Sequence, residues 1–425
     1  MSVILGCIAD DLTGATDIAM ILQRSGLKVA QIVGVPYDQT PVPDADAIVI
    51  SLKSRTIPAA DAIDQSITSC RWLKDQGAQQ IFFKYCSTFD STEQGNIGPV
   101  CDALMQELNV KTTIACPSFP ENGRTVYKGH LFVNDVLLSA SPLKDHPLTP
   151  MTNSNLKQVL SSQCDATVEN IFFNEIENGI RPLSDTSSSN PNSKIYIMDS
   201  LTDEHLLKIG KACKDLSLIT GGSAVGQGLI DNYLEKGILS SKSQESFDAP
   251  IGKTVILSGS CSEATRKQIA YAKLTIDSFQ INVFDILSGK DVVTEALSWA
   301  ENQLQDDDAV LIYSSTTPDD LEHIHKHGNA LEIGEQVEAV LSTLATKLHA
   351  QNIKRFVVAG GETSGAVINS LNVNTLEIGP MIDPGVPWTK SIGDSSIALA
   401  LKSGNFGSDD FFTKAISQLN SLNGR

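Results

Sequence analysis

The chain has 425 residues, 41% of them hydrophobic and 19% charged, which is more than one core usually supports and enough apolar material for two. Its formal net charge of −18 disfavours phosphate backbones and anionic lipid surfaces, so we expect no nucleic-acid or membrane partner. Eight cysteines without a Cys-x-x-Cys pair, together with the absence of a membrane-spanning apolar run, predict a reduced, cytoplasmic protein.

The first half of the chain repeats one pattern, in which an apolar run is followed by a polar loop and a stretch with helical periodicity. The pattern predicts strands at Val3–Ala9, Ala47–Leu52, Gln80–Lys84, Thr112–Ala115, Lys194–Met198 and Leu218–Thr220. It predicts helices at Ala15–Arg24, Ala59–Asp75 and near Pro99–Leu108. Continuous apolar strands that alternate with helices are typical of a parallel sheet covered on both faces.

The pattern lapses near Tyr233–Lys253, where the polar segment Ser240–Pro250 is a reasonable linker, and then resumes. Further strands are expected at Thr254–Leu257, Ile281–Ile286, Ala309–Ser314 and Arg355–Ala359, and helices at Ser262–Leu274 and Gly334–Ala350. We therefore predict an α/β fold of two domains, residues 1–240 and 250–425. Each is expected to be a largely parallel sheet with helices on both faces.

Ligands of open α/β sheets bind beyond the C-terminal ends of the strands, which draws attention to the polar residues there. Asp10 and Asp11 follow the first strand. Because neighbouring strand residues point to opposite sides, we expect the two acids to have different roles, one of which is helix capping. Arg55 follows the next predicted strand and is a candidate fork for a carboxylate, although a surface ion pair explains it equally well.

A second polar loop follows the strand that ends at Lys84. It contains Asp90-Ser91-Thr92 and then Gly95-Asn96, residue types that hold hydroxyl groups and a carboxylate.

Three glycine loops mark the second half of the chain. They are Ser258–Ser262, Gly360–Gly365 and the loop from Lys402 to Gly407 around Gly404. Paired glycines let a backbone approach a phosphate closely, and a following helix supplies free N–H groups. One such loop is as easily an ordinary turn, but three in one domain favour a nucleotide site.

The standard sequence motifs for nucleotide binding are incomplete in this chain. The P-loop motif is not present, because Phe247 occupies its first glycine position before Gly252-Lys253-Thr254. The segment Gly221–Gly226 has Ser223 in place of the middle glycine of a dinucleotide fingerprint, which leaves an NAD-dependent oxidoreductase as an alternative. The histidines of Glu322–His327 fall on different helix faces, so we predict no metal site in the protein itself. A non-catalytic sugar-acid sensor is a further alternative.

In combination, several segments resemble the four-carbon acid sugar kinase family. They are Ile8–Asp17, the loop Lys84–Asn96, Phe119-Pro120 with Gly123-Arg124, Gly221–Ser223, Ser258–Ser260 and Gly360–Gly365. The resemblance spans essentially the whole chain in order. It implies an N-terminal domain that binds the sugar acid and a C-terminal domain that binds ATP with Mg²⁺. It also implies ATP contacts at Ser258, Gly360, Gly361, Glu362, Thr363 and Gly404.

Within that family, the opening Leu5–Asp11 and the Lys84–Asn96 loop look like the 3-oxo-tetronate kinases. Threonate and erythronate kinases, the alternative, more often have Leu-Arg where this chain has Glu93-Gln94. We expect transfer of the ATP γ-phosphate to the 4-hydroxyl of a 3-oxo-tetronate. Substrate contacts are expected at Asp10, Asp11, Arg55, Lys84, Asp90, Ser91 and Thr92.

Kinases commonly use an aspartate as the base that takes the hydroxyl proton, and we predict Asp11 for that role. Asp90, Asp383 and Asp409 are the other acids considered. Lys84 and Arg55 would neutralise the substrate carboxylate. The oligomeric state is left open, a homodimer included.

Overall fold

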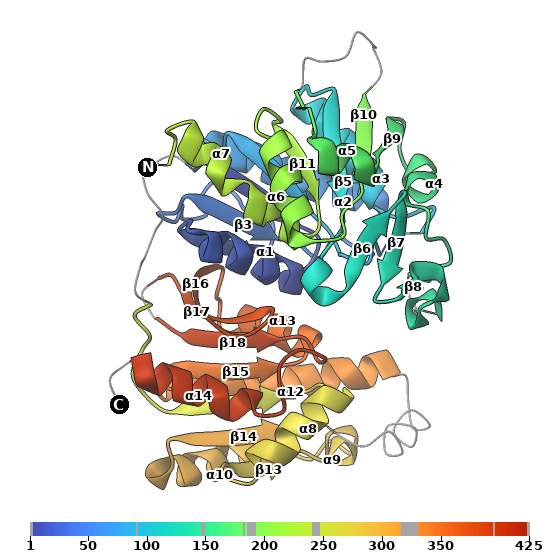
Figure 1. Cartoon of the computed structure of the whole chain (residues 1–425). Helices are drawn as coiled ribbons and strands as arrows, with labels where there is room; N and C mark the ends of the chain where they lie inside the picture. The colour runs from blue at the N-terminus through green and yellow to red at the C-terminus, as the bar shows by residue number, and fades with distance from the viewer. Residues whose placement is uncertain are drawn as a thin grey trace. The chain divides into compact units, whose positions relative to one another are not determined.

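The computed structural model describes residues 3–90, 92–145, 149–181, 183–184, 193–239, 247–315, 330–393 and 396–422. The chain divides into two compact units, Met1–Glu245 and Ser246–Arg425 (Figure 1). Most of the expected linker and of the loop Ser184–Ser193, and all of Glu322–His327, lie outside the described residues. No helix in the described ranges is both long and apolar enough to cross a membrane.

The N-terminal unit is built on a parallel sheet. In sheet order its strands are β2 (Val29–Val33), β3 (Ala47–Ser51), β1 (Leu5–Ala9), β4 (Gln80–Lys84), β11 (Leu218–Gly221), β5 (Thr112–Cys116), β10 (Lys194–Met198) and β9 (Thr167–Ile171). All five residues of β1 and of β4 are buried, as expected for strands covered on both faces.

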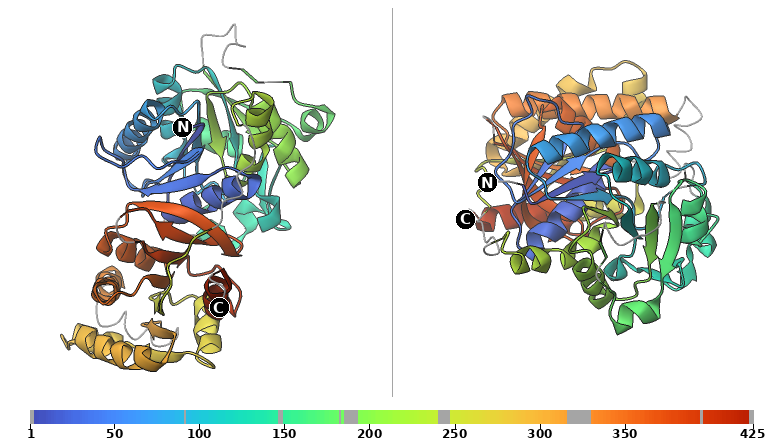
Figure 2. Two further views of the ribbon diagram at one scale, coloured as in Figure 1. Left: turned by 90° about the vertical axis from the view of Figure 1, so that its left-hand side faces the viewer. Right: turned by 90° about the horizontal axis from the view of Figure 1, so that it is seen from above.

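Helices cover both faces of this sheet (Figure 2). They are α1 (Leu12–Ser25), α2 (Ala59–Asp75), α3 (Ile97–Glu107), α4 (Leu156–Ser161), α5 (Phe173–Asn178), α6 (Asp203–Ala212) and α7 (Ile230–Glu235). Helix α2 packs against α3, whereas α1 and α6 pack against the 3₁₀ helix η4 (Ser223–Gly228). Asp11 is the N-cap of α1, and Gly26 ends the helix with a φ of 112°, which favours glycine.

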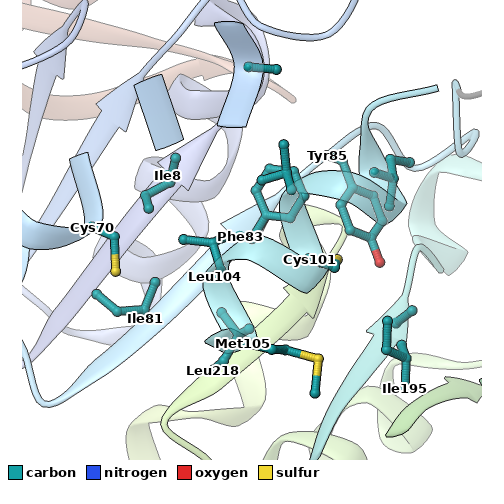
Figure 3. Close-up of a cluster of buried hydrophobic side chains, with 14 of the residues drawn as sticks. Ile8, Cys70, Ile81, Phe83, Tyr85, Cys101, Leu104, Met105, Ile195 and Leu218 are labelled. Carbon is teal, nitrogen blue, oxygen red and sulfur yellow. The ribbon is translucent and has the colours of Figure 1, made fainter. Parts of the chain in front are cut away.

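The main core of this unit lies between the sheet and the α2–α3 pair. Figure 3 shows Ile8 of β1 and Phe83 of β4 on the sheet side, with Cys70 of α2 and Leu104 of α3 opposite. These side chains are at most 2% exposed. A small antiparallel sheet of β6 (Arg124–Tyr127), β7 (His130–Val133) and β8 (Val136–Leu137) is attached to the unit, together with the short 3₁₀ helices η1 (Pro120–Asn122), η2 (Leu138–Ala140) and η3 (Pro142–Asp145).

The C-terminal unit has a second, largely parallel sheet. In order its strands are β13 (Asp277–Gln280), β14 (Ala309–Tyr313), β12 (Thr254–Ser258), β15 (Arg355–Ala359), β18 (Ala398–Lys402), β17 (Val386–Ser391) and β16 (Thr375–Asp383), of which β17 and β16 run antiparallel to their neighbours. Its helices are α8 (Glu263–Ala272), α9 (Val283–Leu287), α10 (Val292–Asp306), α12 (Ala330–Ala350), α13 (Gly361–Ser370) and α14 (Phe411–Leu422).

Helices α8 and α14 pack together, and α12 packs against both α10 and α13. Trp388 and Phe411 belong to the core of this unit and are fully buried, and the indole N–H of Trp388 donates to the carbonyl of Ala415 at 3.1 Å. The predicted fold class, two α/β units with largely parallel sheets, is confirmed.

The expected strand Ile281–Ile286 is wrong. The strand β13 ends at Gln280, and Val283–Leu287 is the short helix α9. Asn282 causes the change, because its side chain accepts the N–H of Phe284 at 2.9 Å and caps the helix.

Candidate functional site

Three neighbouring strands of the N-terminal unit end at the same edge of the sheet. Lys84, the last residue of β4, pairs with Ala9 of β1 on one side and with Gly221 of β11 on the other. The N–H of Asp10 donates to the carbonyl of Lys84 at 3.1 Å, which ties the loop after β1 to the end of β4. The predicted polar segments after β1 and β4 are therefore neighbours in space.

Asp10, Asp11 and Asp90 converge on Arg55, and we call these four residues the arginine cluster. Arg55 donates to both oxygens of Asp10, from Nε at 2.8 Å and from Nη2 at 2.9 Å. Its Nη2 also lies 2.7 Å from Asp11 Oδ2, and its Nη1 lies 3.6 Å from Asp90 Oδ2. The Arg55 side chain is 22% exposed and that of Asp10 only 7%, so the cluster is largely shielded from water.

The expectation that Asp10 and Asp11 point to opposite sides is wrong. Strand β1 ends at Ala9, so the alternation of side chains does not extend to the two acids, and both reach Arg55. They nevertheless differ in their other contacts. Asp11 Oδ1 accepts the N–H of Gly14 at 2.5 Å and so caps α1, whereas both oxygens of Asp10 are bound by Arg55.

Burial and charge act differently on the two acids. Burial raises the pKa of Asp10 despite the attraction of Arg55. Burial also opposes ionisation of Asp11, but the charges of Arg55 and Lys84 and the N–H of Gly14 outweigh it and bring the pKa of Asp11 below its usual range. Asp11 is therefore the more firmly ionised of the pair.

Asn96 holds the loop that carries Arg55. Its Nδ2 donates to the carbonyls of Ser54 and Ile57, both at 2.8 Å, and lies 3.3 Å from that of Arg55. In the loop after β4, Thr88 Oγ1 donates to Asp90. Ser91 lies outside the described residues, Thr92 is half-buried, and Glu93 and Gln94 are exposed.

Lys84 lies against α1 and is only 4% exposed. A Cβ on Gly14 would stand 2.2 Å from Lys84 Nζ, so only glycine allows this approach. Among the residues that the structure describes, no carboxylate lies within 4.0 Å of this ammonium. Lys84 is thus a buried cation close to, but not bonded to, the acids around it.

In the C-terminal unit the three glycine loops meet at the ends of β12, β15 and β18. The N–H groups of Gly259 and Ser260 donate to the Ala359 carbonyl at 3.1 and 3.2 Å, and that of Gly360 donates to the Lys402 carbonyl at 2.9 Å. Ser258 Oγ is buried next to this group, 3.1 Å from the hydroxyl of Ser315. The order β12–β15–β18 brings these loops together.

The Gly404 carbonyl is a shared acceptor in this group. It accepts from Ser262 Oγ at 2.6 Å, Thr265 Oγ1 at 2.8 Å and Lys402 Nζ at 3.1 Å. Lys402 is 1% exposed and also donates to Thr265 Oγ1 at 2.8 Å. Within the described residues it forms no ion pair, and burial lowers its pKa to about 7.

The start of α13 is open. Gly360 has a φ of 130°, which favours glycine, and no side chain caps the helix. A Cβ on Gly361 would meet nothing within 4 Å, and Gly361 and Glu362 are exposed, whereas Thr363 packs against Gly259 and Gly360. An uncapped helix N-terminus with free space before it is suited to an anion.

The sequence did not single out Lys402, Thr265, Ser260 or Ser315 as site residues. Lys402 had one usable signal, a charged residue at the end of the apolar run Ala398–Leu401. Asp383, an alternative base, is occupied: it accepts from the N–H of Ser408 at 2.9 Å and pairs with Lys414.

The chain is therefore a two-domain α/β protein with a polar, charged candidate site at the end of one sheet and a candidate anion site formed by glycine loops at the end of the other. Residues 5–229 match the model of a "Sugar-binding N-terminal domain" and residues 255–412 that of a "Nucleotide-binding C-terminal domain". The chain belongs to the four-carbon acid sugar kinase family.

Curated relatives cover the whole chain. A 3-oxo-tetronate kinase of Burkholderia multivorans is 47% identical over 98% of this chain and 97% of its own length, and one of Salmonella typhimurium is 41% identical over 97% and 98%. Among solved structures, a suggested tRNA synthase from Salmonella typhimurium has a TM-score of 0.89 and Haemophilus influenzae protein HI1011 one of 0.84. Each is 39% identical and covers 97% of this chain and 99% of its own.

Proposed function

We propose that this protein is a kinase that transfers the γ-phosphate of ATP to the 4-hydroxyl of a 3-oxo-tetronate (3-dehydro-erythronate or 3-dehydro-threonate). The products are 3-oxo-tetronate 4-phosphate and ADP. The observation that carries the proposal is the full-length similarity to curated 3-oxo-tetronate kinases, with 47% identity to that of Burkholderia multivorans. We further propose a cytoplasmic location, and a homodimer stays a prediction.

The two candidate sites correspond to the two substrates of a kinase. We propose that the N-terminal unit binds the sugar acid, with the buried ammonium of Lys84 near its carboxylate and the loop of Asp90, Ser91 and Thr92 around its hydroxyls. The charge of Arg55 is already compensated by Asp10 and Asp11. Its role in the proposed site is therefore to hold these two acids in place. The C-terminal unit would bind ATP at its glycine loops through Ser258, Gly360, Gly361, Glu362, Thr363 and Gly404.

Mg²⁺ would enter with the nucleotide. Within the described residues no group of three or more His, Cys, Asp or Glu side chains is placed to hold a metal ion. Mg²⁺ bound mainly by ATP phosphates and water needs no such group. When bound, it neutralises the charge that develops on the phosphates during transfer.

Turnover across a panel of sugar acids tests the proposed substrate. We expect ADP release, measured with a coupled assay, to be fastest with the two 3-oxo-tetronates, because this chain has Glu93-Gln94 in the loop after β4. Phosphorus NMR of the product should show a phosphomonoester. Turnover of threonate or erythronate alone would instead assign the protein to those kinases.

Calorimetry separates the kinase from the oxidoreductase alternative. We expect heat of binding with ATP and none with NAD. Binding of NAD but not of ATP would contradict a kinase function, whatever the substrate. The measurement does not require knowing which sugar acid is the substrate.

A bulky side chain at Gly361 tests the nucleotide site. Gly361→Val should raise the KM for ATP by about tenfold or more, about 1.4 kcal/mol, because the new side chain would occupy the space before α13. The matched control is Gly365→Val, one turn further along the same helix, where a Cβ also meets nothing within 4 Å. A wild-type KM for ATP in a normally folded Gly361→Val variant would show that the loop is only a turn.

A further inference from the structure

Three polar side chains of the N-terminal unit gather around Gly14, and we call Asp17, Lys84 and Ser223 the lysine cluster. Lys84 Nζ lies directly against Gly14. Asp17 is three residues further along α1 and so occupies the same face of the helix, where the charge of Lys84 acts on it. Ser223, the first residue of η4, lies beside Asp17.

The positive charge of Lys84 is not paired within the described part of the chain. Lys84 is 4% exposed, yet it forms no ion pair there. Asp17 is half-buried and also forms no ion pair, so its carboxylate and the Lys84 ammonium are more than 4.0 Å apart. Ser223, 1% exposed, is placed to donate to the Asp17 carboxylate. A buried ammonium is normally paired, so Lys84 points to an anionic ligand that lies beside Asp17.

The acids of the arginine cluster differ from Asp17, because they are bound by a guanidinium group. Arg55 binds both oxygens of Asp10, and Asp11 is bound by Gly14 on one oxygen and by Arg55 on the other. Asp90 is bound by Thr88 and lies beside Arg55. Hydrogen bonds and charges that stabilise the ionised carboxylate weaken it as a proton acceptor, and Asp11 has both a backbone donor and Arg55.

The electrostatic surroundings agree with the geometry. Burial raises the pKa of Asp17; the charge of Lys84 and the hydrogen bond from Ser223 oppose this effect, and the nearby carboxylates of Asp11 and Glu121 add to it. The pKa of Asp11 is lowered instead. A base is more effective when its proton affinity is closer to the working pH, so Asp17 is the better proton acceptor.

We infer that Asp17 is the catalytic base and that the lysine cluster holds the sugar acid, with Lys84 on its carboxylate, Ser223 on an oxygen between, and Asp17 on the acceptor hydroxyl. The hydroxyl oxygen forms a bond to the γ-phosphorus of ATP, the bond from that phosphorus to the β–γ bridging oxygen breaks to give ADP, and the hydroxyl proton passes to Asp17. This inference rests on the proposed kinase function and replaces Asp11 with Asp17 as the base.

Four full-length variants test the inference: Asp17→Asn, Asp11→Asn, Lys84→Met and, as control, Asp64→Asn, which changes an exposed acid on α2. We expect Asp17→Asn to lower kcat by about 10²-fold or more, to keep the wild-type KM for ATP, and to remove the acid limb of the kcat–pH profile. Asp11→Asn should lower the melting temperature and retain that limb. Lys84→Met should weaken sugar-acid binding by calorimetry at least about tenfold.

The outcomes distinguish this inference from the proposed function. If the wild type turns over a sugar acid but Asp17→Asn keeps kcat within about fivefold and the acid limb, Asp17 is not the base and the kinase assignment stands. A 10²-fold loss of kcat in Asp11→Asn alone would identify Asp11 as the base instead. A wild type that turns over none of the acids would overturn the proposed function and the inference with it.

Discussion

Replacing Arg55 with methionine should lower the free energy of unfolding of the N-terminal unit by about 3–5 kcal/mol, since removing one partner leaves buried charges uncompensated. Arg55 is 22% exposed and binds both oxygens of Asp10, whose side chain is 7% exposed. Urea unfolding followed by the fluorescence of the buried Trp72, in a background with Trp299 and Trp388 changed to Phe, measures the effect.

The chain contains a matched control for this prediction. Arg71 binds both oxygens of Glu107, at 2.9 and 2.8 Å, with the same two-pronged geometry, but its side chain is 65% exposed. Arg71→Met should leave the free energy of unfolding close to that of the wild type, because an exposed ion pair contributes little to stability. Adding Asp10→Asn to Arg55→Met should restore part of the lost stability. Equal losses at Arg55 and Arg71 would contradict the argument that burial makes the pair important.

Lys402→Met should change how the stability of the C-terminal unit depends on pH. In the folded protein burial lowers the pKa of Lys402 to about 7, against an ordinary value of 10.5. Between these pH values the unfolded chain binds a proton that the folded chain lacks, so the free energy of unfolding rises with pH. Its contribution to the slope is about 1.4 kcal/mol per pH unit at most, and the variant should lose it.

Urea titrations between pH 7 and 9 measure this slope, in a Trp72→Phe background that leaves Trp299 and Trp388 as reporters. The carbonyl of Gly404 keeps the Ser262 and Thr265 donors in Lys402→Met, so the variant should fold. The control is Lys267→Met on α8, a 58% exposed lysine that should leave the slope unchanged. Identical slopes in wild type and Lys402→Met would show that Lys402 stays protonated in the folded protein, with its charge compensated by a group in its surroundings.

The fold was predictable where strands are continuously apolar. The segment Gln80–Lys84 is a strand and Ala59–Asp75 a helix with the predicted bounds. The strand β9 was missed because its Glu169 and Asn170 interrupt the apolar pattern. The strands β16 and β17 contain Pro380 and Pro387, which argue against a strand when only the sequence is read.

The candidate site was predictable in part, since polar residues at strand ends are visible in the sequence. That Asp10 and Arg55 form a closed ion pair was not, because it depends on how a loop held by Asn96 folds back. Asp17 and Ser223 are marked in the sequence only as parts of the segments that resemble the family. Asp17 and Ser223 come close to Lys84 because strands far apart in the sequence are neighbours of β4. No local sequence pattern predicts this proximity.

At the proposed nucleotide site, the Gly404 carbonyl is held by Ser262, Thr265 and Lys402, and this has a consequence for binding kinetics. These three donors order the loop before a ligand arrives, so its entropy is lost on folding and not on binding. Because the loop is already ordered, association with the ligand does not have to wait for the loop to close slowly. Ser262→Ala, which removes one donor, should therefore slow association with ADP as well as speed its release.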